Sequence, residues 1–167
     1  NFKKKESKFN YEGFRNTNLL QKGFYTFLSL LKLRPLQLGY FYSPEIHKYV
    51  KNNYKSFDLI LFQSFRMAQY LPKNFKKKSI LDMADLVSKN YEQTSKRLFF
   101  LNPISVIYFI ESWLLKRYEK FCLNNFQKIL LHSRKEINTL DKKYKKKITQ
   151  YSFGIDQIKK KYNFNSE

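Results

Sequence analysis

The chain has 167 residues, of which 43% are hydrophobic and 19% aromatic, and its formal net charge at pH 7 is +20. This length and composition suit one domain with a buried core and exclude a disordered tail. The charge favours an anionic partner: nucleic acid, an acidic membrane surface or a phosphorylated substrate. Lys, Asn, Ile, Phe and Tyr crowd the sequence and Gly, Ala and Pro are scarce, so an AT-rich coding sequence would account for the charge equally well.

Cysteine and histidine are too sparse to indicate a metal site. Cys122 is the single cysteine, which excludes an intrachain disulfide and suits a reducing cytoplasm. His47 and His132 are too distant in sequence to be a local ligand pair, so no metal ligand set and no cofactor is expected in this chain.

No signal peptide or membrane-spanning helix is expected either. The basic residues near the start are not followed by an apolar run. Residues 98–115 are the most apolar stretch, but Asn102-Pro103 interrupts them and Glu111 adds a charge, which is costly inside a bilayer. The expected location is the cytoplasm, with the inner face of the cytoplasmic membrane as an alternative.

The first 34 residues form a poorly defined segment in which residues 23–35 predict a helix stopped by Pro35. Five short apolar runs follow. Their continuous apolar character, without clean alternation, favours strands buried on both faces of a parallel sheet. They lie at residues 36–43, 57–64, 78–85, 127–133 and 146–154.

The segments between these runs predict helices. Ser43 is a suitable N-cap with Pro44 at the first helical position, and Ser133 and Glu136 have the spacing of a capping box. A short helix is expected over residues 85–96. The alternation of strand and helix predicts an α/β fold, a Rossmann-like parallel sheet with flanking helices.

One long amphipathic helix is expected over residues 104–125, beginning at Asn102-Pro103. Its apolar stripe would pack against the rest of the domain, and its charged residues would largely face water. Tyr91 and Trp113 are expected in the core with Tyr118. The stripe comprises Ile107, Ile110, Leu114, Tyr118 and Phe121, and the charged set Glu111, Lys116, Arg117, Glu119 and Lys120.

In an open parallel sheet, ligands bind beyond the carboxyl ends of the strands. The residues expected there are polar, which predicts a cleft at that edge. They are Ser43, Gln63, Ser64, residues 82–85, His132 and Ser133.

Several moderate motifs follow one another in a characteristic order. A strand opens with Phe-Asp at 57–58, a loop carries Met-Ala-Gln-Tyr-Leu at 67–71, and a second strand ends in Leu-Asp-Met-Ala-Asp at 81–85. A long helix with Tyr-Glu at 118–119, a strand leading to Ser-Arg-Lys-Glu at 133–136 and Ser-Phe-Gly-Ile-Asp at 152–156 complete the series. Together, over residues 34–156, they resemble the amino-terminal, acceptor-side half of retaining GT-B glycosyltransferases of the subfamily 4-like, or group 1, branch.

The resemblance implies an enzyme that moves a sugar from a nucleotide sugar to a glycan or lipid-linked acceptor. It implies a partial Rossmann-like domain at residues 35–156, a hinge at Gly154 and Asp156, and the start of an interdomain linker at residues 157–167. The donor-binding domain of the family, the first strands and the glycine-rich loop have no counterpart in the sequence. The chain is therefore expected to be inactive without the missing half.

The resemblance also supplies candidate acceptor residues. Gln63, Ser64 and Arg66 follow a strand whose loop faces the acceptor in that family, and an arginine there would grip a phosphate or carboxylate. Asp85 matches the aspartate of a His-Asp loop near the transfer centre, but Ala84 replaces the histidine, so no catalytic residue is assigned.

Each candidate also has a structural interpretation. Asp85 would cap the helix that begins at Leu86, Ser88 would be either an acceptor ligand or a helix-surface serine, and Ser133 would be a helix cap. Arg66 would equally be a solvated residue at a helix start.

Two further classes of function remain open. Lysine runs at residues 76–78, 142–147 and 159–161 are spread over loops and ends, which favours solvated charge over a continuous nucleic-acid platform. A small basic nucleic-acid-binding α/β protein is the first alternative. The second is a peripheral module whose basic loops and apolar helix rest on an anionic leaflet.

Overall fold

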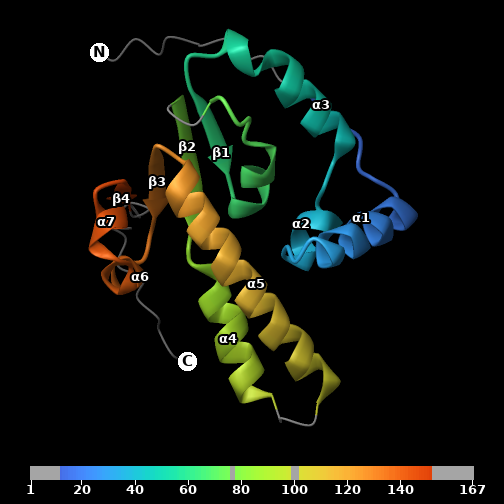
Figure 1. Cartoon of the computed structure of the whole chain (residues 1–167), viewed down its shortest axis with the longest axis vertical. Helices are drawn as coiled ribbons and strands as arrows, with labels where there is room; N and C mark the ends of the chain where they lie inside the picture. Colours follow the sequence, from blue (N-terminus) through green and yellow to red (C-terminus); the bar gives the residue numbers. More distant parts are fainter. Residues whose placement is uncertain (1–11, 76–77, 99–101, 152–167) are drawn as a thin grey trace, which may run out of the picture.

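The computed structural model describes residues 12–75, 78–98 and 102–151. Within them the chain is an α/β fold (Figure 1). Its helices are α1 (Leu19–Leu31), α2 (Leu36–Tyr40), α3 (Pro44–Asn53), α4 (Val87–Arg97), α5 (Pro103–Asn125), α6 (Arg134–Thr139) and α7 (Lys142–Lys145), with 3-10 turns η1 (Tyr54–Ser56) and η2 (Phe65–Tyr70). Its strands are β1 (Ile60–Gln63), β2 (Ser79–Ala84), β3 (Lys128–Leu131) and β4 (Ile148–Gln150).

The four described strands form one parallel sheet in the order β1-β2-β3-β4. Phe62 lies opposite Leu81, Leu81 opposite Ile129, and Ile129 opposite Ile148. Helices occupy the connections between the strands, which confirms the predicted Rossmann-like parallel sheet with flanking helices.

Residues 36–43 are not a strand, and that prediction was wrong. Leu36–Tyr40 form the short helix α2, whose Leu38 and Gly39 are buried. The Leu36 N–H donates to a carboxyl oxygen of Glu111 at 2.8 Å, 75 residues away. A short apolar run cannot distinguish a strand from a buried helical turn, and here the tertiary contact decides.

The prediction that both faces of the sheet are buried was also wrong for the described residues. One face packs against α5, where the Phe62 and Phe126 rings meet edge to face at 5.5 Å. On the other face Leu61 is 58% exposed and Ile80 is only half-buried. The buried face carries Phe62, Leu81, Met83, Ile129 and Leu131.

Local signals located the helix ends well. The Ser43 hydroxyl accepts from the Ile46 N–H, and Pro44 occupies the first turn of α3. Asn102 caps α5 in the same way, with Pro103 as its first residue, so the long helix was placed within one residue. The prediction for α1 was less exact: α1 spans Leu19–Leu31, so it begins and ends four residues earlier than the predicted residues 23–35.

The polarity predicted for α5 was only partly right. Leu114 and Tyr118 are buried, but Ile107, Ile110, Phe121 and Trp113 are exposed. Conversely, Glu111 and Glu119 are buried, at 3% and 4% exposure. α5 extends past the sheet with α4 packed along it (Figure 1), so only part of its length can reach the core.

Gly39 allows α2 to lie directly against α1. A Cβ at this position would overlap the Tyr25 carbonyl group and lie 2.6 Å from the Thr26 Cα, so no side chain fits. At Gly23, on α1 itself, a Cβ would have no neighbour within 4 Å.

We expect Gly39→Ala to lower the free energy of unfolding by about 3 kcal/mol, the upper end of the range for overpacking, because backbone must move. Gly23→Ala should raise it by up to about 1 kcal/mol through helix propensity. Urea unfolding of the two variants beside the parent chain tests this. Equal effects of the two substitutions would refute the close approach of α1 and α2.

Candidate functional site

The carboxyl ends of the four parallel strands form one edge of the sheet, and most of the predicted site residues lie along it. Gln63 and Ser64 end β1, Asp85 follows β2, and Ser133 follows β3. Neighbouring strand ends are therefore brought together as predicted. Gln63 and Asp85 are exposed, and Ser64 and Ser133 are half-buried, so all four present polar groups at the surface.

Two residues at this edge have a backbone conformation that side chains disfavour. Ser64 has φ 77° and Ala84 has φ 59°, and neither is a glycine. Each such residue costs roughly 1–3 kcal/mol, and such residues gather at functional sites. The Ser64 N–H donates to the Asp82 carbonyl at 2.8 Å, so the two strained strand ends are linked. The pairing of β2 with β3 shifts its register between Asp82 and Ala84, at the same point.

Asp82 joins the ends of β2 and β4 at this edge. One of its carboxyl oxygens accepts from the Tyr151 hydroxyl at 2.7 Å and from the Ala84 N–H at 3.1 Å. Desolvation, reinforced by the hydrogen bond to Asp82 and by the charge of Asp85, raises the pKa of Tyr151 to about 12. The Tyr151 ring also lies against His132, with centroids 4.0 Å apart.

Asp85 does not cap α4, and that interpretation was wrong. The N-cap residue is Leu86, whose N–H donates to a carboxyl oxygen of Glu136 at 2.8 Å. Glu136 is therefore turned toward α4, while Ser133 caps α6 by accepting from the Glu136 N–H. Half of the predicted capping box is present, and the exposed carboxylate of Asp85 is left at the sheet edge.

Ser88 is buried, and its polar atoms are hydrogen-bonded within the fold, so it is not the helix-surface serine of the structural interpretation. Its N–H and its hydroxyl donate to the two carboxyl oxygens of Glu119, at 2.8 and 2.6 Å. Burial raises the pKa of Glu119, and these hydrogen bonds partly oppose the shift. The hydrogen bonds between Ser88 and Glu119 tie the first turn of α4 to the second half of α5.

Arg66 is directed away from the sheet edge toward α2. Its Nε donates to the Gln37 side-chain oxygen at 3.0 Å, and its guanidinium lies 4.4 Å from the centroid of Phe41. Gln37 in turn donates from its side-chain nitrogen to Glu111 at 3.3 Å. Arg66 is thus a half-buried member of a network, and the solvated interpretation was wrong.

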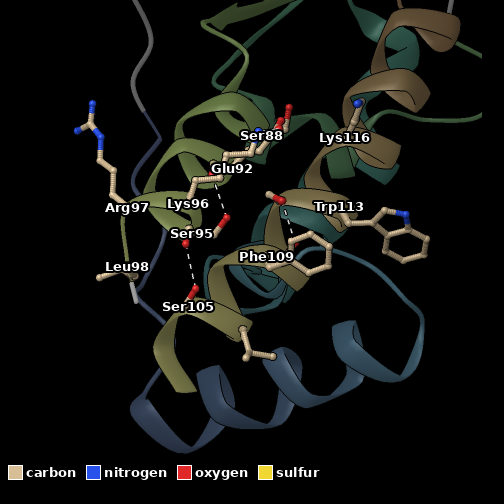
Figure 2. Close-up of a pocket in the computed structure, with 12 residues that line it drawn as sticks. Ser88, Glu92, Ser95, Lys96, Arg97, Leu98, Ser105, Phe109, Trp113 and Lys116 are labelled. Carbon is tan, nitrogen blue, oxygen red and sulfur yellow. Dashed lines mark hydrogen bonds and ion pairs between the residues drawn. The ribbon is translucent and has the colours of Figure 1, made fainter. Parts of the chain in front are cut away.

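A groove of about 870 Å³ lies along α4 and α5 (Figure 2). Its serines are occupied within the fold: the Ser105 hydroxyl donates to the Ser95 carbonyl and the Ser112 hydroxyl to the Phe109 carbonyl. What remains for a ligand is an apolar surface with a basic rim. The apolar residues are Leu98, Val106, Phe109 and Trp113, and the basic ones are Arg97, Lys116 and Lys96, the last of which forms an ion pair with Glu92 at the same rim.

The predicted hinge residues Gly154 and Asp156 lie outside the described residues. Within residues 12–75, 78–98 and 102–151, no three histidine, cysteine or acidic side chains gather as a metal site. None of the helices in those ranges is long and apolar enough to cross a membrane.

Sequence reasoning missed three residues of the edge and its surroundings. Tyr151 is the first residue after β4, so the rule that located Ser64 and Ser133 would have found it. The buried roles of Glu111 and Glu119 carry no local signal, because their partners lie 75 and 31 residues away.

Comparisons of the chain with protein-family models, with curated proteins and with solved structures found no match.

Glu119 generates a pH prediction. Because burial raises its pKa above the usual 4.5, the folded state keeps this proton after the unfolded chain has lost it. A variant in which residue 119 does not titrate provides the reference. Relative to it, the free energy of unfolding of the parent chain should fall as the pH rises from about 4.5 through the raised pKa of Glu119. Glu119→Gln removes the titration and keeps one of the two acceptor oxygens for Ser88, while its amide nitrogen can donate to the Ser88 hydroxyl oxygen.

We expect the stability of Glu119→Gln relative to the parent chain to increase between pH 4 and pH 7 in urea unfolding. Glu92→Gln, on exposed α4 surface, is the control and should not show this rise. Parallel curves for Glu119→Gln and the parent chain would contradict the raised pKa.

Proposed function

We propose that this chain supplies the acceptor side of a retaining GT-B glycosyltransferase. In this proposal the enzyme moves a sugar from a nucleotide-sugar donor to a glycan or lipid-linked acceptor. A second domain holds the nucleotide sugar, and the sheet edge of the present chain holds the acceptor. The observation that carries the proposal is the pair of left-handed residues, Ser64 and Ala84, at adjoining strand ends among exposed polar groups.

The chemistry of the edge suits a ligand rich in hydroxyl groups. Asp85 offers a charged acceptor, Ser64 and Ser133 offer hydroxyls, and Gln63 offers both a donor and an acceptor. A sugar presents several hydroxyls that donate and accept in different directions, and such a mixed set satisfies them. The order of sequence motifs over residues 34–156 supports the same assignment.

The parts of the edge differ in their expected roles. Asp85 would bind and orient an acceptor hydroxyl, because its carboxylate is exposed and is not used as a helix cap. Asp82 and Tyr151 are already bonded to each other and would hold the edge in shape. Arg66 is bonded to Gln37 of α2 and Ser88 to Glu119 of α5, so neither is assigned to the acceptor.

Asp85→Asn should weaken binding of an acceptor saccharide about tenfold or more, because hydrogen bonds to a charged group are the stronger ones. An array of free and lipid-linked oligosaccharides would identify a ligand, and titration followed by NMR would give its affinity. The backbone amide signals that shift should include Ser64, Ala84 and Ser133.

The matched control is Asp58→Asn. Asp58 is also an exposed aspartate but precedes β1, at the opposite edge of the sheet. Equal losses in the two variants, or no saccharide bound by the parent chain, would refute the assignment.

A second candidate function, binding to an anionic membrane surface, is favoured by a specific surface. Apolar side chains are exposed along the part of α5 that extends past the sheet: Phe109 is 65% exposed and Trp113 50%. α1 exposes further ones, with Leu19 and Leu20 at 78% and 86%. The basic rim of the α4–α5 groove stands beside the first group (Figure 2), and a basic, apolar surface of this kind suits an anionic leaflet.

Trp113 is the single tryptophan of the chain and reports on this surface. Its fluorescence should shift to the blue with vesicles containing phosphatidylglycerol and stay unchanged with pure phosphatidylcholine. Phe109→Gln should lower partitioning about fivefold or more, because it removes an aromatic ring from the interface. The control is Phe57→Gln, which removes an exposed ring just before β1 and should leave partitioning unchanged. If Phe109→Gln partitions as strongly as the parent chain, this surface does not bind the membrane.

A further inference from the structure

A separate pocket lies where the connection between α1 and α2, the turn η2 and the second half of α5 meet. Its volume is about 390 Å³. None of the residues that line it belongs to the sheet edge. Three cations stand around it, Lys32, Arg34 and Arg117. Its apolar wall includes Leu71, Leu114 and Phe121.

Two residues that line this pocket carry a buried polar atom with an unmet hydrogen bond among the described residues. The Gln69 side-chain nitrogen has no partner among them. The Tyr118 hydroxyl interacts with the Arg34 side chain, which can only donate, so the hydroxyl proton has no acceptor. Tyr118 is 7% exposed. Buried polar groups are nearly always paired, so two unmet hydrogen-bond donors on residues of one pocket require an explanation. A ligand that accepts hydrogen bonds from both would supply the missing partners.

The charge of the pocket has the sign that such an acceptor needs. The half-buried Arg34 guanidinium lies 6.0 Å from the centroid of the Tyr118 ring. Within the described residues the single ion pair joins Lys96 to Glu92 on α4, so no carboxylate neutralises Arg34. Burial raises the pKa of Tyr118 far above its usual range, and its hydroxyl therefore remains a donor at neutral pH.

A strained backbone turn at the end of α1 places Arg34 at the pocket. Leu33 has φ 48° and closes α1: its N–H donates to the Leu30 carbonyl, and the Arg34 N–H donates to the Ser29 carbonyl, both at 2.9 Å. A glycine is usual at such a helix end, and leucine there is strained. The strained turn sets the direction in which the chain leaves α1 and places Arg34 at the pocket.

We propose that this pocket binds a phosphate group through Arg34, Tyr118 and Gln69. A phosphate presents several acceptor oxygens, and a guanidinium matches two of them in its planar fork. Tyr118 and Gln69 then donate to the remaining oxygens. The apolar wall of Leu71 and Phe121 suits an organic group esterified to the phosphate. The inference does not rest on the proposed glycosyltransferase function, since it uses none of the residues at the sheet edge.

The test is calorimetric titration of the full chain with inorganic phosphate, pyrophosphate and octyl phosphate at fixed ionic strength. The parent chain should bind at least one of them saturably. Tyr118→Phe removes only the hydroxyl, and affinity should fall about tenfold or more. Because the proton of that hydroxyl has no acceptor without ligand, the variant should stay folded, with a free energy of unfolding in urea close to that of the parent chain.

Tyr144→Phe is the matched control, since Tyr144 carries the other buried tyrosine hydroxyl without a partner, on α7. It should leave phosphate affinity unchanged. Arg34→Gln should abolish measurable binding, whereas Lys120→Gln, an exposed charge on α5 outside the pocket, should not. If Arg34→Gln fails to fold, the comparison of phosphate affinity between Tyr118→Phe and Tyr144→Phe still decides the test.

Octyl phosphate and inorganic phosphate distinguish the source of the group. Tighter binding of octyl phosphate supports an esterified phosphate whose chain lies on the apolar wall, and equal binding supports free phosphate or pyrophosphate. Equal losses in Arg34→Gln and Lys120→Gln would show a general charge effect and overturn the site. Full affinity in Tyr118→Phe, or no saturable binding by the parent chain, would overturn it as well.

Discussion

The arrangement of this domain depends on carboxyl groups that bind the free backbone amides at helix starts. Glu111 and Glu119, two turns apart on α5, reach the first residues of α2 and α4 respectively. Glu136 on α6 adds the Leu86 N–H. The first amides of a helix have no partner within it, and the positive end of the helix dipole attracts a carboxylate. Both the amide and the buried acid would be costly if left unpaired.

This constraint explains why the sheet edge has its shape. α4 starts three residues after the strained Ala84, and its start is held by Glu119 from one side and Glu136 from the other. The end of β2 therefore cannot relax by shifting α4, and Asp85 stays at the surface. The Ser64 N–H bonded to the Asp82 carbonyl transmits the same restraint to β1. An edge held from behind in this way can present polar groups in fixed directions, which a binding site requires.

The sequence predicted the elements that short-range signals determine. Four strands, the start of α3 and the bounds of α5 follow from apolar runs and from caps such as Ser43 and Asn102, which act within three residues. The failures share a physical cause. α2 was taken for a strand and Glu111 for a solvated residue because each depends on the other across 75 positions. In the site, the rule for strand ends found Gln63, Ser64, Asp85 and Ser133, whereas the inward roles of Arg66 and Ser88 depend on distant partners.

The use of carboxyl groups at helix starts also bears on the positive charge of the chain, because it leaves few acids to pair with lysine and arginine side chains. The chain has 13 acidic residues against 33 lysines and arginines. Several of the acids are occupied by backbone amides or hydroxyls: Glu111, Glu119 and Glu136 at helix starts, Glu45 at the Arg15 N–H, and Asp82 at Tyr151. A carboxylate held by backbone amides keeps its charge but is not placed to form an ion pair with a surface lysine or arginine, and the net charge of +20 is left over after all 13 acids are counted. Arg34 is an example of a cation left without an acidic partner among the described residues. Its backbone N–H closes α1, and its side chain lies beside Tyr118 at the pocket, where no described carboxylate pairs with it.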